Sequence, residues 1–168
     1  MAWRELYSYW RGRHVDGVAP GRAGIDPPID IPRLLPNLII FDRIDGHFRI
    51  RLAGSEIVRR AGRDATGLTL DTDMMDYHGI VTLLDFLGRV IATGEPVIYS
   101  VARGSDTAFG AIGILLPLTG ADGKPAMVLG GVFYRSTRTG ESSEPWMPGA
   151  LTELSLTDML EQDIGVYR

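Results

Sequence analysis

Residues 25–46, IDPPIDIPRLLPNLIIFDRIDG, place four prolines directly ahead of a run of apolar residues. Each proline fixes its own φ, removes one amide donor and disfavours the helical conformation of the residue before it. The sequence therefore predicts an ordered, extended segment over 25–37, called the proline lead-in below, with one helical turn at 32–35. This segment delivers the chain to a strand that begins near residue 38.

A β-hairpin is predicted directly after the proline lead-in. Residues 38–44 and 47–53 flank Asp45-Gly46, the dipeptide favoured by a type I′ turn. A two-residue turn fixes the register, so the numbers of paired residues are expected to sum to 91. Asp42 and Arg49 then form a charge pair on one face. The other face is apolar except for Arg43 at its turn end, and its apolar residues are Ile39, Phe41, Phe48, Ile50 and Leu52.

The remaining pattern predicts helices on either side of this hairpin and three further strands. A short amphipathic helix is expected at the N-terminus and a long one at 76–93, while 54–75 reads as short helical turns. The apolar stripe of the long helix is Tyr77, Ile80, Val81, Leu83, Leu84, Leu87, Val90 and Ile91. The predicted strands are 97–103, 109–118 and 126–135.

Composition excludes several classes of function. At 168 residues, with 45% apolar and 23% charged residues, the chain is expected to form one globular domain. The absence of cysteine removes disulfides, thiolate metal sites and thiol adducts to a flavin. A net charge of −4 with scattered basic residues disfavours nucleic-acid and membrane-surface binding. We expect a cytoplasmic location because no signal peptide or span of ~20 apolar residues is seen.

The order of elements resembles the PAS domain, a sensory and interaction module. The segments YSYW, GRAGIDPPIDIPRLLPNLIIFD, FRIRLAGSEIVRRAGRDATG and LLPLTGADGKPAMVLGGVF are similar to those of a bacterial family of small, often free-standing PAS-type proteins. The resemblance implies an α+β fold: a five-stranded antiparallel sheet with helices on one face, preceded by an N-terminal amphipathic helix. It places the PAS-like domain at 22–136, after a helix and loop at 1–21 and before a linker and tail at 137–168.

The resemblance makes haem a cofactor to consider, since haem is a common PAS ligand. His78 lies on the predicted long helix but on its polar face, whereas an iron ligand must point into the pocket. His47 is expected on the outer face of the hairpin and His14 in a glycine-rich loop. Haem is therefore disfavoured. No metal site is expected, because DTDMMD at 71–76 departs from a calcium loop and is better explained as acids at a helix start.

Three functions are consistent with these residues. The first is a non-catalytic sensory or adaptor module that binds a second copy of itself or a signalling protein. Its interaction helix would present Trp3, Leu6, Tyr7 and Trp10, although the same stripe could instead pack within the chain. The second is a metabolite sensor with an apolar pocket between the sheet and the long helix. That pocket would be lined by Phe41, Ile50, Leu84, Leu87, Tyr99 and Ile112.

The third function is a small cone-fold enzyme of the isomerase or dehydratase type. General acid–base work would require a carboxyl group or histidine facing the cavity, and the hairpin register puts Asp42 on the outer face. No catalytic residue is predicted, although Tyr99, Arg103 or Glu56 could line a pocket.

Charged residues in and before the proline lead-in allow two interpretations. Arg22 and Arg33 stand beside Asp26 and Asp30. They are predicted to be ion-paired tethers or, alternatively, contacts for an anion.

Overall fold

The computed structural model describes residues 1–70, 79–103, 106–135 and 148–162. The helices and 3-10 turns are α1 (Ala2–Gly12), the turn Arg22–Gly24, α2 (Pro27–Asp30), the turn Pro32–Asn37, α3 (Ser55–Ala61), α4 (Ile80–Thr93) and α5 (Leu156–Glu161). The strands are β1 (Leu38–Ile44), β2 (His47–Ala53), β3 (Thr69–Leu70), β4 (Val97–Arg103), β5 (Asp106–Thr119), β6 (Pro125–Tyr134) and β7 (Pro148–Leu154). His78 and the acidic segment at 71–76 lie outside the described residues.

The described strands form one antiparallel sheet of seven strands in the order β3-β2-β1-β6-β5-β4-β7. The α+β class and the five expected strands are present. The expected number of strands was too small, because β3 pairs with β2 at one edge of the sheet and β7 pairs with β4 at the other. β7 follows a segment rich in Ser, Thr, Gly, Glu and Pro that reads as a linker, and its pairing with a strand about fifty residues earlier leaves no local pattern.

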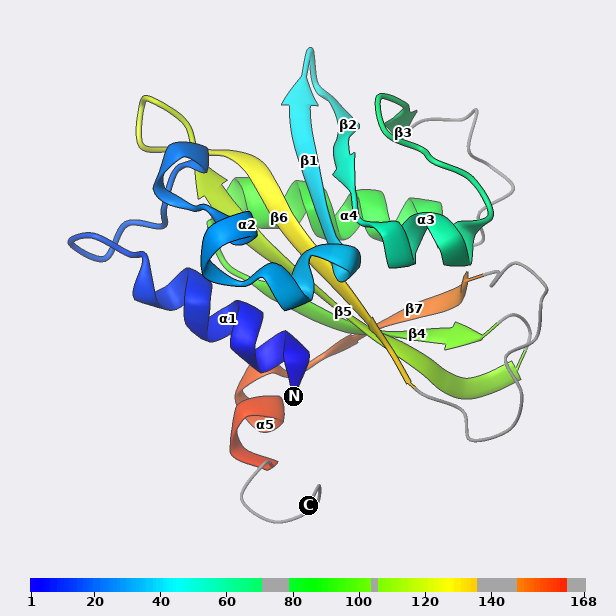
Figure 1. Cartoon of the computed structure of the whole chain (residues 1–168). Helices are drawn as coiled ribbons and strands as arrows, with labels where there is room; N and C mark the ends of the chain where they lie inside the picture. Colours follow the sequence, from blue (N-terminus) through cyan, green and yellow to red (C-terminus); the bar gives the residue numbers. More distant parts are fainter. Residues whose placement is uncertain (71–78, 104–105, 136–147, 163–168) are drawn as a thin grey trace.

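Helices cover both faces of the sheet, not one (Figure 1). α4 lies across one face and contacts β5 and β6, whereas α1 contacts the same two strands from the other side. The buried apolar side chains accordingly form two clusters. One is built around α4, Phe41, Tyr99 and Leu115, and the other around α1, Leu38, Ile40 and Ile114. We call them the α4-side core and the α1-side core.

The β1–β2 hairpin has the predicted turn but only part of the predicted register. Asp45 and Gly46 both have positive φ, as a type I′ turn requires. The pairs from Ile44↔His47 to Phe41↔Ile50 sum to 91, but a bulge follows and Ile40 pairs with Leu52. The bulge adds Arg51 as an extra residue, so Leu52 leaves the apolar face and Ala53 takes the place beside Ile39. The prediction of Leu52 in the core was therefore wrong.

α4 carries the predicted amphipathic stripe, rotated by part of a turn. Its buried residues are Ile80, Leu83, Phe86, Leu87, Val90 and Ile91. Val81 was expected inside and is 78% exposed, because Phe86 rather than Val81 completes the stripe. The helix ends at Gly94, which adopts the left-handed conformation expected of a C-terminal cap.

Glycines in β5 and β6 receive side chains from neighbouring elements. A Cβ at Gly113 would meet the ring of Tyr99, and a Cβ at Gly131 would lie 2.7 Å from Leu6 Cδ2. The space that a side chain would occupy above these two glycines is therefore taken by other side chains of the same chain, as close packing requires. Within the described ranges, none of the helices combines the length and apolar character needed to cross a membrane.

Candidate functional site

The aromatic stripe of α1 is buried against the chain's own sheet. Trp3, Leu6 and Trp10 are each at most 2% exposed, and Tyr7 is half-buried. The indole N–H of Trp10 donates a 2.8 Å hydrogen bond to the carbonyl of Pro117 in β5. Of the two interpretations that the sequence allowed, packing within the chain is the one the structure has. These side chains reach a second copy only if α1 leaves the sheet.

Polar contacts hold α1 to the proline lead-in. The hydroxyl of Tyr9 donates to Asp30 Oδ2 at 2.8 Å and accepts from the backbone N–H of Asp26 at 2.9 Å. Arg13, just past the end of α1, forms a 2.8 Å ion pair with the same Asp30 carboxylate. Partial burial, together with the hydrogen bond to Asp30, raises the pKa of Tyr9. The sequence predicted ion-paired tethers here, but Asp30 pairs with Arg13 and not with the neighbouring Arg33.

Arg22 and Arg33 do not share a site. The Arg33 guanidinium pairs with the carboxylate of Glu5 on α1, and this pairing raises the pKa of Arg33. Arg22 instead donates to the carbonyl of Ile25 at 3.1 Å. An anion at Arg33 would have to compete with the carboxylate of Glu5.

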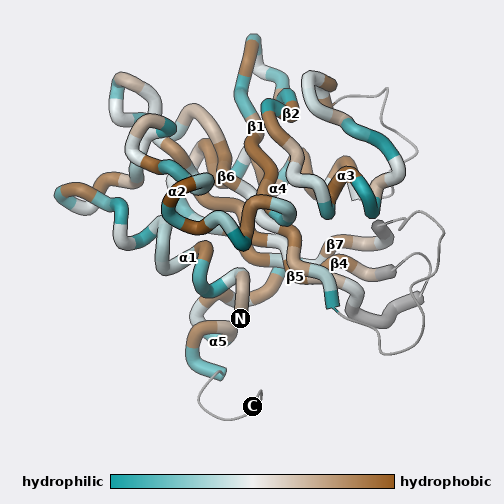
Figure 2. The backbone as a smooth tube through the Cα atoms, in the orientation of Figure 1, coloured by the Kyte–Doolittle hydropathy of each residue, from teal (hydrophilic) through white to brown (hydrophobic). Residues whose placement is uncertain are grey.

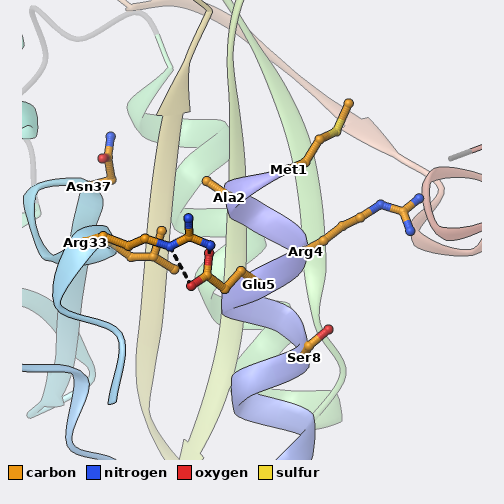
Figure 3. Close-up of a pocket in the computed structure, with 8 residues that line it drawn as sticks. Met1, Ala2, Arg4, Glu5, Ser8, Arg33 and Asn37 are labelled. Atoms are coloured by element: carbon orange, nitrogen blue, oxygen red, sulfur yellow. Dashed lines mark hydrogen bonds and ion pairs between the residues drawn. The ribbon is translucent and has the colours of Figure 1, made fainter. Parts of the chain in front are cut away.

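An open groove of about 510 Å³ lies beside this ion pair, between α1 and the turn Pro32–Asn37. Figure 3 shows Arg33 reaching across to Glu5, while Arg4 points to the other side of α1. Arg4 donates to the carbonyls of Met159 and Leu160 and so fixes the end of α5 to α1. The charged side chains that line the groove, Arg4, Glu5 and Arg33, are therefore already engaged within the chain.

Asp42 in β1 is the one buried charged residue of the described chain, at 6% exposure. Its Oδ2 accepts from Arg49 at 3.2 Å and from Arg51 at 3.3 Å, both on β2. Its Oδ1 is buried and has no hydrogen-bond partner among the described residues. An unpaired buried acceptor costs about 1–3 kcal/mol, whereas half-exposed ion pairs return ~1 kcal/mol or less each. Stability alone does not account for this cluster.

The sequence predicted the pair of Asp42 and Arg49 but not the second arginine. In the regular predicted register Arg51 would stand opposite Ile40, on the same face as Asp42 and diagonal to it. In the structure Arg51 is the extra residue of the bulge and binds the same carboxylate oxygen as Arg49. A bulge leaves only a weak trace in a single sequence, so the position of Arg51 in the ladder had no clear signal.

A family model described as PAS domain matches residues 1–133. This chain belongs to the PAS domain family. The resemblance to the PAS domain seen in the sequence is thereby confirmed. Neither the curated proteins nor the solved structures contain a match to the chain. PAS domains typically serve as sensory and signalling modules without catalytic activity of their own.

The PAS match covers both cores from α1 to β6, and β7 and α5 lie beyond it. β7 extends the sheet, α5 packs against it, and both are held to the domain by specific contacts. β7 pairs with β4, and Glu153 in β7 is bound by both terminal nitrogens of Arg89 on α4. α5 packs Leu156, Met159 and Leu160 against the α1-side core.

Five of the six residues predicted to line a PAS ligand pocket lie on the α4 side. Phe41, Ile50, Leu87 and Tyr99 are buried in the α4-side core, and Leu84 packs against it. Ile112 is the exception, because it belongs to the α1-side core. Neighbours in a strand alternate between faces, so Ala111 and Leu115 point towards α4 and Ile112 points away. Ile112 is therefore withdrawn from the pocket.

The candidate acid–base residues of an enzyme are held in ion pairs. Glu56 on α3 is bound by Arg59 and Arg60, whose hydrogen bonds lower its pKa to about 2. Asp42 is bound by two arginines on the face that looks away from α4. The side chain of Arg103 lies outside the described part of the chain. His14 and His47 lie apart, on the loop after α1 and on β2.

Proposed function

We propose that this PAS domain is a non-catalytic sensory or regulatory module that acts by binding another protein, either a second copy or a signalling protein. The observation that carries the proposal is the family match, which spans every element from α1 to β6. Such a module needs a stable core and a surface that presents side chains to a partner. The buried Asp42 with its two half-exposed arginines supplies such a surface.

The state of the acids favours binding over catalysis. A general acid or base works best with a pKa near the operating pH. Glu56, with a pKa of about 2, remains ionised at neutral pH and holds its proton too weakly for that task. In Asp42 the Oδ2 atom accepts hydrogen bonds from two arginines, and the Oδ1 atom is buried. Both arrangements fix arginine side chains in place.

The packing of α1 constrains how a homodimer could form. Dimer formation through the stripe of Trp3, Leu6 and Trp10 would require two copies to exchange their α1 helices, since each stripe is buried on its own sheet. Association through an outward face would leave α1 in place. The second route needs no rearrangement of the α1-side core and is the one we propose.

Photo-crosslinking in the source cells tests this function. A photoreactive residue is placed singly at Ser8, Leu52 or Val81, which are exposed on α1, β2 and α4. We expect a discrete protein adduct, of doubled mass for a second copy, from at least one position. Native mass spectrometry of the purified protein is run alongside. The absence of adducts at all three positions, together with a small molecule retained in the native mass spectrum, would contradict the proposal and indicate a metabolite sensor.

A further inference from the structure

The outer face of the β1–β2 hairpin is the part of the α1-side surface that α1 does not cover. In Figure 1 the hairpin projects beyond α1 and the proline lead-in, and in Figure 2 its projecting end is largely hydrophilic. The face holds Ile44, Arg49, Arg51 and Leu52 above the buried Asp42, and we call it the arginine face.

The bulge in β2 determines the composition of this face. Because Arg51 is the extra residue, Leu52 pairs with Ile40 and lies on the outer side of the sheet. Leu52 and Ile44 are each 39% exposed there. Two apolar side chains thus flank the arginines in the same strand pair. Bulges frequently re-aim side chains at binding sites, and this one places an apolar residue beside a charged pair.

The charges on the arginine face are only half balanced. Both guanidinium groups bind the same oxygen, Asp42 Oδ2, so one carboxylate faces two positive charges. Each guanidinium has five N–H donors, and among the described residues each makes one side-chain hydrogen bond, to Asp42. The side chains of Arg49 and Arg51 remain 43% and 56% exposed, so a partner can approach both of them. A second anion would complete the balance.

Asp42 also orients the two arginines in advance. An arginine held by a buried carboxylate loses less freedom when it binds than one that moves in solvent. The Asp42 Oδ1 atom lacks a partner among the described residues, so the hydrogen bonds of this carboxylate come from the two arginines alone within that part of the chain. The cluster is therefore built to hold two guanidinium groups side by side at the surface.

We propose that the arginine face binds an acidic segment of a partner protein. A carboxylate of that segment bridges Arg49 and Arg51, and apolar side chains beside it contact Ile44 and Leu52. Charge complementarity selects an acidic segment, and the two apolar neighbours select a peptide over a free anion. This inference rests on the proposed function, since it names the surface and the partner chemistry of the same module.

The probe is a synthetic peptide of repeated Leu-Glu-Glu units, with a Leu-Gln-Gln peptide of equal length as its control. Binding is followed by amide shifts of isotope-labelled protein and by fluorescence anisotropy. We expect shifts centred on residues 42–52, binding that weakens as salt is raised, and little binding of the Gln peptide. Inorganic phosphate that produces the same shifts at the same concentration would show a free-anion site and overturn the proposal.

Arg49→Gln/Arg51→Gln is the direct variant, and we expect its affinity for the Glu peptide to be at least about tenfold lower. Since removal of both arginines leaves Asp42 buried without a counter-charge, Asp42→Asn/Arg49→Gln/Arg51→Gln is made as a neutral version that keeps the hydrogen-bonding shapes. Arg43→Gln is the matched control: it lies in the same hairpin, is exposed, and pairs with Phe48 on the opposite face. Unchanged affinity in the neutral version would overturn the proposal.

The two proposals fail separately. If the protein adducts of the crosslinking experiment persist in the neutral variant, the domain still binds a partner but the arginine face is not the surface. If the Glu peptide binds as expected while no adduct forms in cells, the surface has the inferred chemistry and the proposed function is wrong. Conversion of a wild-type dimer into a monomer by the neutral variant would identify a second copy as the occupant and overturn the acidic partner.

Discussion

The two faces of the sheet are covered in different ways. On the α4 side, one helix from the middle of the chain packs six buried apolar residues onto the strands. On the α1 side, the cover is assembled from α1, the proline lead-in and α5, which are joined by polar contacts such as those of Tyr9, Arg33 and Arg4. The second cover stops short of the hairpin. The α1 side therefore combines a packed core with an outer hairpin face that its own helices leave uncovered.

Among the substitutions considered, Trp3→Ala is expected to lower the stability of the protein most. Trp3 is 2% exposed in the α1-side core, so truncation should lower the free energy of unfolding by about 3–5 kcal/mol. Urea unfolding measures this change, and Ser8→Ala, on the exposed face of the same helix, is the control. A variant that keeps its unfolding free energy but changes its oligomeric mass would instead make α1 an interface helix.

Gly113→Ala tests the close packing on the α4 side. The added methyl group would meet the buried ring of Tyr99, so we expect a loss of about 1–3 kcal/mol in unfolding free energy. Gly88→Ala is the control within α4, where nothing lies within 4 Å of the new methyl group and a gain of about 0.5–1 kcal/mol is expected. Equal stability of the two variants would show that Tyr99 does not fill the space above Gly113.

Tyr9→Phe weakens the attachment of α1 to the proline lead-in. Loss of the bonds to Asp30 and to the Asp26 amide should lower the unfolding free energy by about 1 kcal/mol. Because the pKa of Tyr9 is raised above 10.0, its contribution is present below pH 10.0 and is lost as the pH rises through the folded-state value. Alkaline unfolding curves of the two proteins should converge; parallel curves would contradict the contact.

Glu56→Gln should have the smallest effect. The pKa of Glu56 is lowered from 4.5 to about 2 by Arg59 and Arg60, so the stabilisation is present above pH 4.5 and is lost as the pH falls towards 2. Arg59 is half-exposed, and both pairs join residues three or four apart on the same helix, so we expect a loss of about 0.5 kcal/mol at neutral pH. An acid-unfolding midpoint that is identical in both proteins would show that these ion pairs do not stabilise the fold.

Local patterns predicted the elements better than the contacts between them. The Asp45-Gly46 turn, the aromatic stripe of α1 and the stripe of α4 are encoded in neighbouring residues, and the α+β class and PAS family followed from their order. The face of Ile112 and the existence of β7 depend on strand pairings between distant segments. Such pairings leave no periodic signal in a single sequence.

The candidate site was predicted in part for the same reason. Asp42 and Arg49 follow from the turn, since a two-residue loop fixes the first four pairs of the hairpin. Arg51 also binds Asp42, and it does so as the extra residue of a bulge between Ile40 and Phe41 that the turn does not predict. Tyr9 lies just off the apolar stripe of α1, and its role depends on where the proline lead-in crosses the helix.

Crosslinking from the arginine face is the most direct test of the account. A photoreactive residue at position 52 is compared in the wild-type background and in Asp42→Asn/Arg49→Gln/Arg51→Gln, with position 81 on α4 as the reference. The account predicts a protein adduct from position 52 that is lost in the neutral variant while the fold, judged by urea unfolding, is kept. An adduct that persists in that variant, or that forms only from position 81, would contradict the account.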